Sequence, residues 1–239
     1  MHLEFQIKST KGISMINYVS EKIGIEIGGP SNIFRSLIPV YLKAKRVDGV
    51  NFSNKTVWEG EIHSGKTYQY LPNTFGDQFI SDGTDLKEIE DESYEFLLSS
   101  DCLEHIANPI KALLEWKRIL KTNHLMLLVL PNKKSNFDHQ REFTTFQHIV
   151  DDYKKNIDES DMTHLREILS LHDLSKDPAA GNFQQFTARS LDNINNRCLH
   201  HHVFNQDLIK KMLEVTGFKT ISIEETATSF VAIAMKNQT

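Results

Sequence analysis

The amino-acid sequence predicts an α/β fold in which a mostly parallel β-sheet is covered by helices on both faces. Short apolar runs alternate with loops and amphipathic segments, which is the pattern of parallel strands joined by crossover helices. The run at 125–130 (LMLLVL) is apolar at every position, as in a central strand buried from both sides. A chain of 239 residues suits one large domain better than two small ones.

Apolar runs mark the strand candidates, and helix-compatible spacing of apolar residues marks the helix candidates. The seven strand candidates are 23–27, 44–52, 78–81, 94–99, 125–130, 218–224 and 230–235. The helix candidates are 109–121, 146–155, 161–171 and 206–215. Gly217 follows the last of them and suits a left-handed helix cap.

Residues 133–205, which follow the fifth strand candidate, differ in character from the rest of the chain. This segment is rich in His, Asp, Glu, Arg and Asn and holds no long apolar run. A break is expected at 178–181 (PAAG). We therefore expect a single domain over 1–239 that carries an insertion at 133–205.

Composition disfavours several classes of function. A net charge of -5 and a pI near 6.1 lack the basic excess that nucleic-acid binding needs. Cys102 and Cys198 form no CxxC pair, so we expect neither a disulfide framework nor a structural zinc site, and a reducing compartment is indicated. No apolar run approaches the length of a membrane span, and the first residues lack a signal-peptide pattern. We expect a cytoplasmic location without membrane contact.

The first strand candidate ends in a glycine turn that opens a helix. In α/β sheets this turn, at the carboxyl end of the first strand, is where nucleotide-like ligands bind. A dinucleotide fingerprint needs glycine at positions 28, 30 and 33, but the chain has Gly28, Pro30 and Ile33 there. Pro30 has no N–H to offer a phosphate, so a nicotinamide-dependent oxidoreductase is disfavoured. A ligand without phosphate, or a turn without any ligand, stays open.

Together with residues 79–132, this turn resembles the class I S-adenosylmethionine-dependent methyltransferases. Their first motif has an acidic and an apolar residue before Gly-x-Gly, and 26–29 (EIGG) match it, with Pro30 departing at the second motif glycine. The stretch 79–86 (FISDGTDL) and the L-E-H signature, the R-x-L-K helix end and the Pro-Asn strand end within 91–132 are also similar. The resemblance implies a Rossmann-like, doubly wound sheet of seven strands, with S-adenosylmethionine as cofactor.

The resemblance also implies roles for single residues. Glu26 would orient the amino-acid end of the cofactor through water or backbone, and Gly28 and Gly29, followed by Pro30, would line it. An acidic residue at the end of the second strand would accept the two ribose hydroxyls. The remaining cofactor contacts implied are Asp82 and Gly83 at the adenine, and Ser99, Ser100 and Asp101 at the methionine part and the sulfonium. For Asp101, a helix cap is the alternative role.

Two residues compete for the ribose contact. Asp48 stands at about the right place in the second strand candidate, and its carboxylate would offer paired acceptors to the vicinal hydroxyls. The stretch VDGVNFS can also be aligned with Asn51 in that position, where an amide would hold the hydroxyls less strongly.

Methyl transfer needs alignment of donor and acceptor in a dry pocket and no enzyme nucleophile. A hydroxyl or ammonium acceptor also needs a base, for which histidine is the usual choice. The candidates are His105 in the L-E-H signature, and His139, Arg141 and His148 after the Pro-Asn strand end. His148 would share a face with Arg141 if this segment were helical.

Other charged residues of the insertion have two interpretations each. Arg189 and Arg197 could clamp a carboxylate or phosphate on an acceptor, or lie in a solvated surface. The run His200, His201 and His202 would present two imidazoles to a metal if it formed a strand. Packing is the interpretation we favour for this run, so no metal is predicted.

The sequence therefore favours methylation of a small polar or anionic acceptor, with a sugar, a nucleotide-sugar or another glycan intermediate as the class we consider. The insertion is expected to cover the carboxyl ends of the strands and to bind the acceptor. The alternative for its surface is solvation or formation of a homodimer. The alternative for the whole chain is a catalytically inactive binding or scaffold protein with the same fold.

Overall fold

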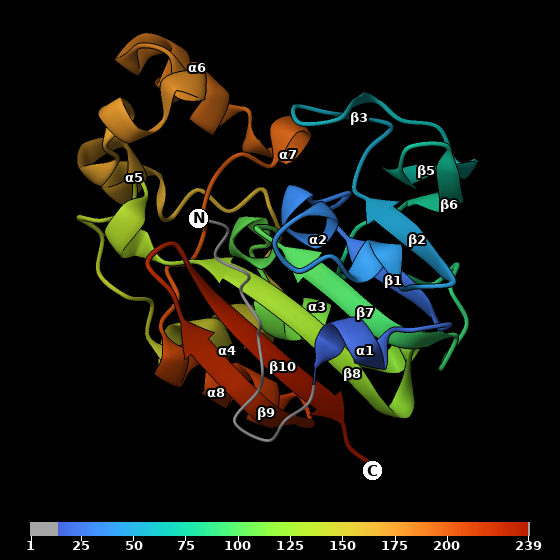
Figure 1. Cartoon of the computed structure of the whole chain (residues 1–239). Helices are drawn as coiled ribbons and strands as arrows, with labels where there is room; N and C mark the ends of the chain where they lie inside the picture. The colour runs from blue at the N-terminus through green and yellow to red at the C-terminus, as the bar shows by residue number, and fades with distance from the viewer. Residues whose placement is uncertain (1–13, 239) are drawn as a thin grey trace.

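The computed structural model describes residues 14–238 and shows an eight-stranded sheet with helices on both faces (Figure 1). The strands of this sheet are β1 (Ile23–Ile27), β2 (Arg46–Asn51), β5 (Gly65–Leu71), β6 (Thr74–Ile80), β7 (Tyr94–Ser100), β8 (Leu120–Pro131), β9 (Phe218–Glu225) and β10 (Ser229–Lys236). Strands β3 (Lys55–Thr56) and β4 (Gly60–Glu61) pair separately.

The strand order β5-β6-β2-β1-β7-β8-β10-β9 contains five neighbouring parallel strands, from β6 to β8. Strands β5 and β10 pair antiparallel with their neighbours. The mostly parallel, doubly wound sheet is thus confirmed, whereas the expected count of seven strands is wrong by one. The additional strand is β5, in which Tyr68 and Tyr70 are buried while Thr67 and Gln69 are exposed, the alternation of a half-buried strand.

Helices are distributed over the two faces of the sheet. They are α1 (Met15–Tyr18), α2 (Asn32–Arg35), α3 (Pro109–Ile119), α4 (Phe146–Lys155), α5 (Leu165–Leu171), α6 (Phe183–Leu191), α7 (Asn193–Asn196) and α8 (Gln206–Val215). Short 3₁₀ helices are η1 (Val40–Leu42), η2 (Leu103–His105), η3 (Lys133–Ser135), η4 (Leu174–Lys176) and η5 (Pro178–Ala180).

Strand β8 separates the two apolar cores, as its uniformly apolar sequence predicts. Met126 and Leu128 pack in one core with Trp116 of α3 and other side chains of α3 and α8. Leu127 and Val129 pack in the other core, on the side of α1 and α2. This burial from both faces fixes β8 in the middle of the sheet, and the loops at its carboxyl end are held in place by it.

The predicted insertion at 133–205 is built from helices α4 to α7 and three 3₁₀ turns, and within this described range there is no strand. Figure 1 places α5, α6 and α7 at the end of the sheet toward which β7 and β8 point. Its own apolar cluster is small, with Ile168, Ala180, Phe186 and Leu199 as its buried members. Over residues 14–238, no helix has both the length and the apolar character needed to cross a membrane.

Candidate active site

A cavity opens at the carboxyl ends of β1, β2, β6 and β7, where the strand order reverses between β1 and β7. Such a switch point is the usual ligand site of an open α/β sheet. The cavity has about 800 Å³ of empty space, its mouth included. It is lined by Ile27, Gly28, Val50, Asn51, Phe52, Trp58, Ser81, Asp82, Gly83, Asp101, Cys102, His105, Ile106 and Arg197. Arg197 comes from the insertion, so this segment closes one side of the cavity.

Gly28 begins the turn that follows β1, and its backbone requires glycine. Its φ is +85°, in the left-handed region, and a Cβ there would lie 2.6 Å from the Cys102 sulfur. At Gly29 a Cβ would overlap the carboxyl group of Glu26. The two glycines therefore allow the turn to lie against β1 and the loop after β7, with Gly28 in the cavity wall.

Glu26 lies below this turn and does not reach the cavity. Its buried carboxylate accepts hydrogen bonds from the Ser31 backbone N–H and hydroxyl, at 3.1 and 2.5 Å, and from the hydroxyl of Tyr68 at 2.6 Å. Tyr41 also donates to it. Its carboxylate is thus bonded to the turn and to tyrosines of η1 and β5, and its expected role, to orient the amino-acid end of the cofactor through water or backbone, stays a prediction.

The two candidates for the ribose contact lie in different places. Asp48 points away from the cavity, where its carboxylate contacts Arg46 at 2.9 Å, the Tyr94 hydroxyl at 3.0 Å and the Asp77 N–H at 2.9 Å. Asn51, the last residue of β2, lines the cavity and donates from its amide to the Gly29 carbonyl at 2.9 Å. Asn51, and not Asp48, thus lies at the end of the strand and lines the cavity, while the residue that contacts the ribose stays a prediction.

Asp82 and Gly83 line the cavity after β6. The Asp82 carboxylate accepts from the backbone N–H of Thr84 at 2.8 Å, which holds the loop in a tight turn. Its second oxygen contacts Arg197 at 3.0 Å, and Arg197 also contacts Glu159 at 2.5 Å. The guanidinium of Arg197 thus joins the insertion to the loop after β6, and both of its terminal nitrogens are paired with carboxylates.

Asp101 follows β7 with a φ of 48° and lines the cavity. Its carboxylate accepts from the Ser100 hydroxyl at 2.9 Å, and burial raises its pKa. The side chain does not cap η2, so the helix-cap role is not adopted. Ser99 and Ser100 are buried and outside the set of lining residues, and the Ser99 hydroxyl bonds the Ile27 carbonyl at 3.2 Å.

Among the proposed bases, His105 reaches the cavity. Its Nδ1 lies 3.1 Å from the Leu199 carbonyl, which accepts a hydrogen bond, so Nδ1 carries the proton and Nε2 the lone pair. Burial, together with the neighbouring His200, lowers the pKa of His105 well below its usual value. The ring is therefore neutral at neutral pH. Glu104 beside it is buried, and both of its carboxylate oxygens lack a hydrogen-bond partner among residues 14–238.

His139, Arg141 and His148 do not line the cavity. His139 pairs with Asp173 at 3.0 Å, and His148 contacts His164 at 2.9 Å between ring nitrogens. The expected shared helix face of Arg141 and His148 is wrong, because α4 begins only at Phe146. The expectation that these three residues meet the acceptor stays a prediction, and in this structure their side chains contact other residues of the insertion.

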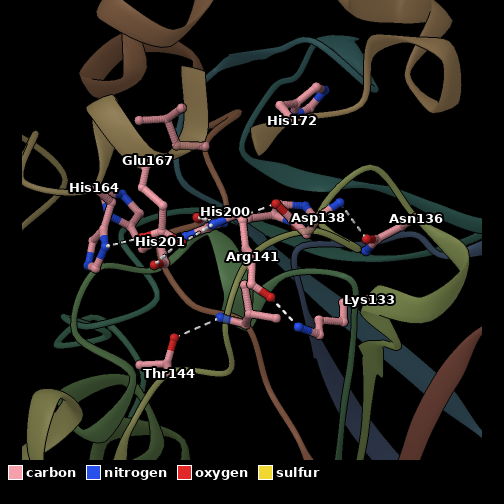
Figure 2. A network of polar contacts seen from close by, with 12 residues as sticks. Lys133, Asn136, Asp138, Arg141, Thr144, His164, Glu167, His172, His200 and His201 are labelled. Atoms are coloured by element: carbon pink, nitrogen blue, oxygen red, sulfur yellow. Dashed lines mark hydrogen bonds and ion pairs between the residues drawn. The ribbon is translucent and has the colours of Figure 1, made fainter. Parts of the chain in front are cut away.

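Arg141 is instead the centre of a buried polar network (Figure 2). Its guanidinium contacts Asp138 at 3.0 Å and Glu167 at 3.1 Å, and it donates to the His200 carbonyl at 2.8 Å. The backbone carbonyl of Arg141 accepts from Lys133. This network fixes the segment around His200. In the same segment Arg197 lines the cavity, and the carbonyl of Leu199 bonds His105.

Sequence reasoning missed the aromatic and apolar part of the cavity wall. Phe52 and Trp58 follow β2, their ring centroids are 5.9 Å apart, and Trp58 is 45% exposed. The Arg197 guanidinium lies 5.1 Å from the Phe52 ring centroid on the cavity side of the insertion. The signal available was Phe52 directly after the strand end and Trp58 six residues later, in a mostly polar stretch.

The residues of the cavity fit a nucleoside with an attached amino acid. Apolar side chains from β1, β2 and the loop after η2 form a slot for a flat base. Asn51, Asp82 and Asp101 offer acceptors at three separate strand ends, as hydroxyl and amino groups of such a ligand require. The tight turn at Gly28 brings backbone close to the middle of the slot.

Solved structures share this fold over nearly the whole chain. An S-adenosylmethionine dependent methyltransferase from Mesorhizobium loti matches with a TM-score of 0.54 and 11% identity, covering 92% of this chain and 94% of that one. PH0226 protein from Pyrococcus horikoshii OT3 matches with 0.52 and 13%, covering 93% and 86%. A chain of the complex between the Haloferax volcanii Trm112 methyltransferase activator and a methyltransferase matches with 0.53 and 10%, covering 94% and 88%. A search of curated proteins found no match.

The fold and the position of the cavity define a Rossmann-like, S-adenosylmethionine-dependent methyltransferase. A family model described as a methyltransferase domain matches residues 17–223, so the chain belongs to this methyltransferase family. The resemblance read from the sequence motifs is thereby confirmed, and S-adenosylmethionine is the cofactor.

Proposed function

We propose that this methyltransferase methylates a hydroxyl group of a small, polar and uncharged acceptor, with a sugar or another glycan intermediate as the class of molecule. The observation that carries the proposal is His105, a neutral imidazole with a fixed tautomer in the cavity wall. The cofactor supplies an electrophilic methyl group on a sulfonium, so the protein has to align a nucleophile and take its proton.

The cofactor contacts we propose follow the cavity wall. Gly28 and Asp101 lie where the amino-acid end would be held, Asn51 beside the ribose, and Asp82 with Gly83 at the base. Of the residues expected from the sequence, Glu26, Pro30 and Asp48 then act on the cofactor only by shaping the turn and the second strand.

His105 is the proposed base because Nε2 carries its lone pair while Nδ1 is anchored on the Leu199 carbonyl. Anchoring by a backbone carbonyl keeps the ring orientation when Nε2 gains a proton. The insertion supplies this carbonyl, and it also supplies Arg197 to the cavity wall. We therefore keep the proposal that 133–205 covers the acceptor site, through Arg197 and the Leu199 carbonyl.

Charge and aromatic surface support an uncharged acceptor over an anionic one. Arg197, the cationic side chain in the cavity wall, is already paired with Asp82 and Glu159. Trp58 is half-exposed at the mouth and offers an apolar face of the kind on which a sugar ring can pack.

The test is transfer of a labelled methyl group from S-adenosylmethionine by the full chain to three acceptor sets: free sugars, nucleotide-sugars and amines. We expect a labelled product from the free sugars. His105→Ala should lower kcat by about 10²- to 10⁴-fold, the range for loss of a general base, with the affinity for S-adenosylhomocysteine unchanged within a few-fold. His63→Ala, on an exposed histidine, is the matched control and should keep full activity.

A product from nucleotide-sugars alone would contradict the uncharged acceptor, and a product from amines alone would contradict the hydroxyl. Full turnover by His105→Ala would show that His105 is not the general base. Tight binding of S-adenosylhomocysteine without transfer in any set would support a binding or scaffold protein instead.

A further inference from the structure

Three histidine rings gather outside the active-site cavity, where the insertion meets the loop after η2. His148 lies on α4, His164 directly precedes α5, and His202 lies between α7 and α8. Each offers one ring nitrogen, and these atoms lie within 4.8 Å of one another. The ring centroids are 4.8 Å apart for the pair His148–His164 and 5.8 Å for each of the pairs with His202. A separation this small brings three imidazoles to a common point.

A carboxylate completes the group. Asp152 stands one helical turn after His148 on α4, and its Oδ2 lies 3.2 Å from His148 Nε2 and 3.8 Å from His202 Nε2. This oxygen is buried and has no hydrogen-bond partner in the described part of the chain. We call His148, Asp152, His164 and His202 the imidazole cluster.

His202 has a tautomer set by its surroundings. Its Nε2 lies 3.1 Å from the Ala107 carbonyl, which can only accept, so Nε2 carries the proton. The lone pair is then on Nδ1, which is buried and lacks a partner among residues 14–238. In this tautomer Nδ1, and not Nε2, is the nitrogen that can bind a metal, and a backbone carbonyl on the other ring nitrogen is the usual support of such a histidine.

Hydrogen bonds within the protein do not satisfy this cluster. A single proton between His148 Nε2 and His164 Nε2, at 2.9 Å, pairs those two rings. Asp152 Oδ2 and His202 Nδ1 are buried without a hydrogen-bond partner among residues 14–238, which is unfavourable for both groups. A cation at the centre of the cluster would accept a lone pair from each of these nitrogen and oxygen atoms.

We infer that the imidazole cluster binds one divalent transition-metal ion, for which zinc is the fitting choice. Imidazole nitrogen and carboxylate oxygen are both ligands of zinc, and the four groups match the four-coordinate geometry that this ion prefers. The His148 side chain is 36% exposed and leaves an edge through which the ion enters.

The ion would cross-link segments of the insertion that share only a small apolar core. It would join α4, the start of α5 and the segment between α7 and α8, and through His202 and the Ala107 carbonyl it would reach the loop after η2. The insertion's own buried apolar cluster has only four members among its described residues. Metal binding adds directly to the free energy of folding in such a case. This inference does not depend on the identity of the acceptor.

The test is metal binding by the full chain after treatment with a chelator. Zinc is titrated by calorimetry, metal content after dialysis is measured by mass spectrometry, and cobalt is added to detect the visible bands of a tetrahedral site. We expect one ion per chain in the wild type. His164→Ala and Asp152→Ala should each weaken binding by at least about 100-fold, since even residues that only support a ligand contribute 10- to 100-fold.

Two further variants locate the ion. His139→Ala removes a half-buried histidine of the same insertion that pairs with Asp173, and it should bind zinc like the wild type. Glu104, His105 and His200 also bring ligand atoms within 4.8 Å, and Glu104→Gln tests that group. We expect Glu104→Gln to retain the ion.

The inference is overturned if the folded wild type takes up no stoichiometric zinc or cobalt. It is equally overturned if Glu104→Gln loses the ion while His164→Ala keeps it, or if both His164→Ala and His148→Ala bind normally. His148 is partly exposed, so His148→Ala provides a folded variant even if changes at buried Asp152 unfold the chain. Circular dichroism of each variant confirms the folded state before titration.

Discussion

The guanidinium of Arg141 lies 3.0 Å from the carboxylate of Asp138, and the two side chains are only 2% and 3% exposed. The same carboxylate contacts His200 Nδ1 at 2.5 Å. Arg141 also holds the His200 carbonyl, one residue after the Leu199 carbonyl that anchors His105. This buried pair therefore positions the cavity wall without touching the cavity.

We predict that Arg141→Ala destabilises the protein by about 3–5 kcal/mol, because it leaves the Asp138 carboxylate buried without its cation. Urea unfolding monitored by circular dichroism measures this change. Arg166→Ala, on an exposed arginine of the same insertion, should stay within about 0.5 kcal/mol of the wild type. A cost below about 1 kcal/mol for Arg141→Ala would show that the pair is not needed to hold the insertion.

Much of the fold could be predicted from the sequence, because apolar periodicity reports burial directly. The run at 23–27 is β1, and the segments at 146–155 and 206–215 are α4 and α8 with the expected bounds. Gly217 ends α8 with a φ of 80°. The strand β5 was missed because its alternation rests on two tyrosines among polar residues, and most of β6 is polar.

The site was harder to predict, since a parallel sheet brings together residues that are distant in the chain. Asp48 and Asn51 both fit the second strand, and only the register against β1 and β6 decides which one reaches its end. In the imidazole cluster, one pair has a visible spacing: His148 and Asp152, one turn apart. The other two ligands are placed by the fold of the insertion, for which no periodic signal exists.

We predict that Asn51→Ala weakens the binding of S-adenosylhomocysteine by about tenfold, equivalent to one hydrogen bond of about 1.4 kcal/mol. Asp48→Ala should leave this affinity unchanged within a few-fold and instead lower stability, because it removes the partner of Arg46 and Tyr94. Calorimetry and thermal unfolding separate the two effects. Weaker binding in Asp48→Ala than in Asn51→Ala, with both folded, would reverse the assignment.

The pH dependence of methyl transfer follows from the environment of His105. The base must be neutral to accept a proton, and burial together with His200 holds its pKa well below the usual 6.5. We therefore expect kcat/KM to be level from about pH 8 to about pH 6.5 and to fall only at lower pH. The measurement is the pH profile of labelled methyl transfer under subsaturating acceptor. A descending limb centred at or above about pH 6.5 would point to a different, more exposed base.

The last prediction concerns the buried carboxyl group of Glu104. Burial, and to a lesser degree Asp101, raises its pKa well above the usual value, and in the described chain its oxygens have no hydrogen-bond partner. Between the unfolded pKa and this raised folded pKa, the folded state holds one proton more than the unfolded state. Stability contributed by the protonated group is present at acidic pH and is lost as the pH rises through that window, by at most about 1.4 kcal/mol per pH unit.

Glu104→Gln keeps the shape of the side chain and removes its titration, so the variant should gain stability relative to the wild type as the pH rises. We expect the difference in unfolding free energy to grow as the pH rises above the ordinary glutamate pKa of 4.5, because only the wild type must lose its proton or keep an unpaired buried charge. Glu88→Gln, on an exposed glutamate, is the control and should follow the wild type at every pH. A pH-independent difference would mean that Glu104 is ionised throughout, which its environment permits only if a cation or solvent reaches it.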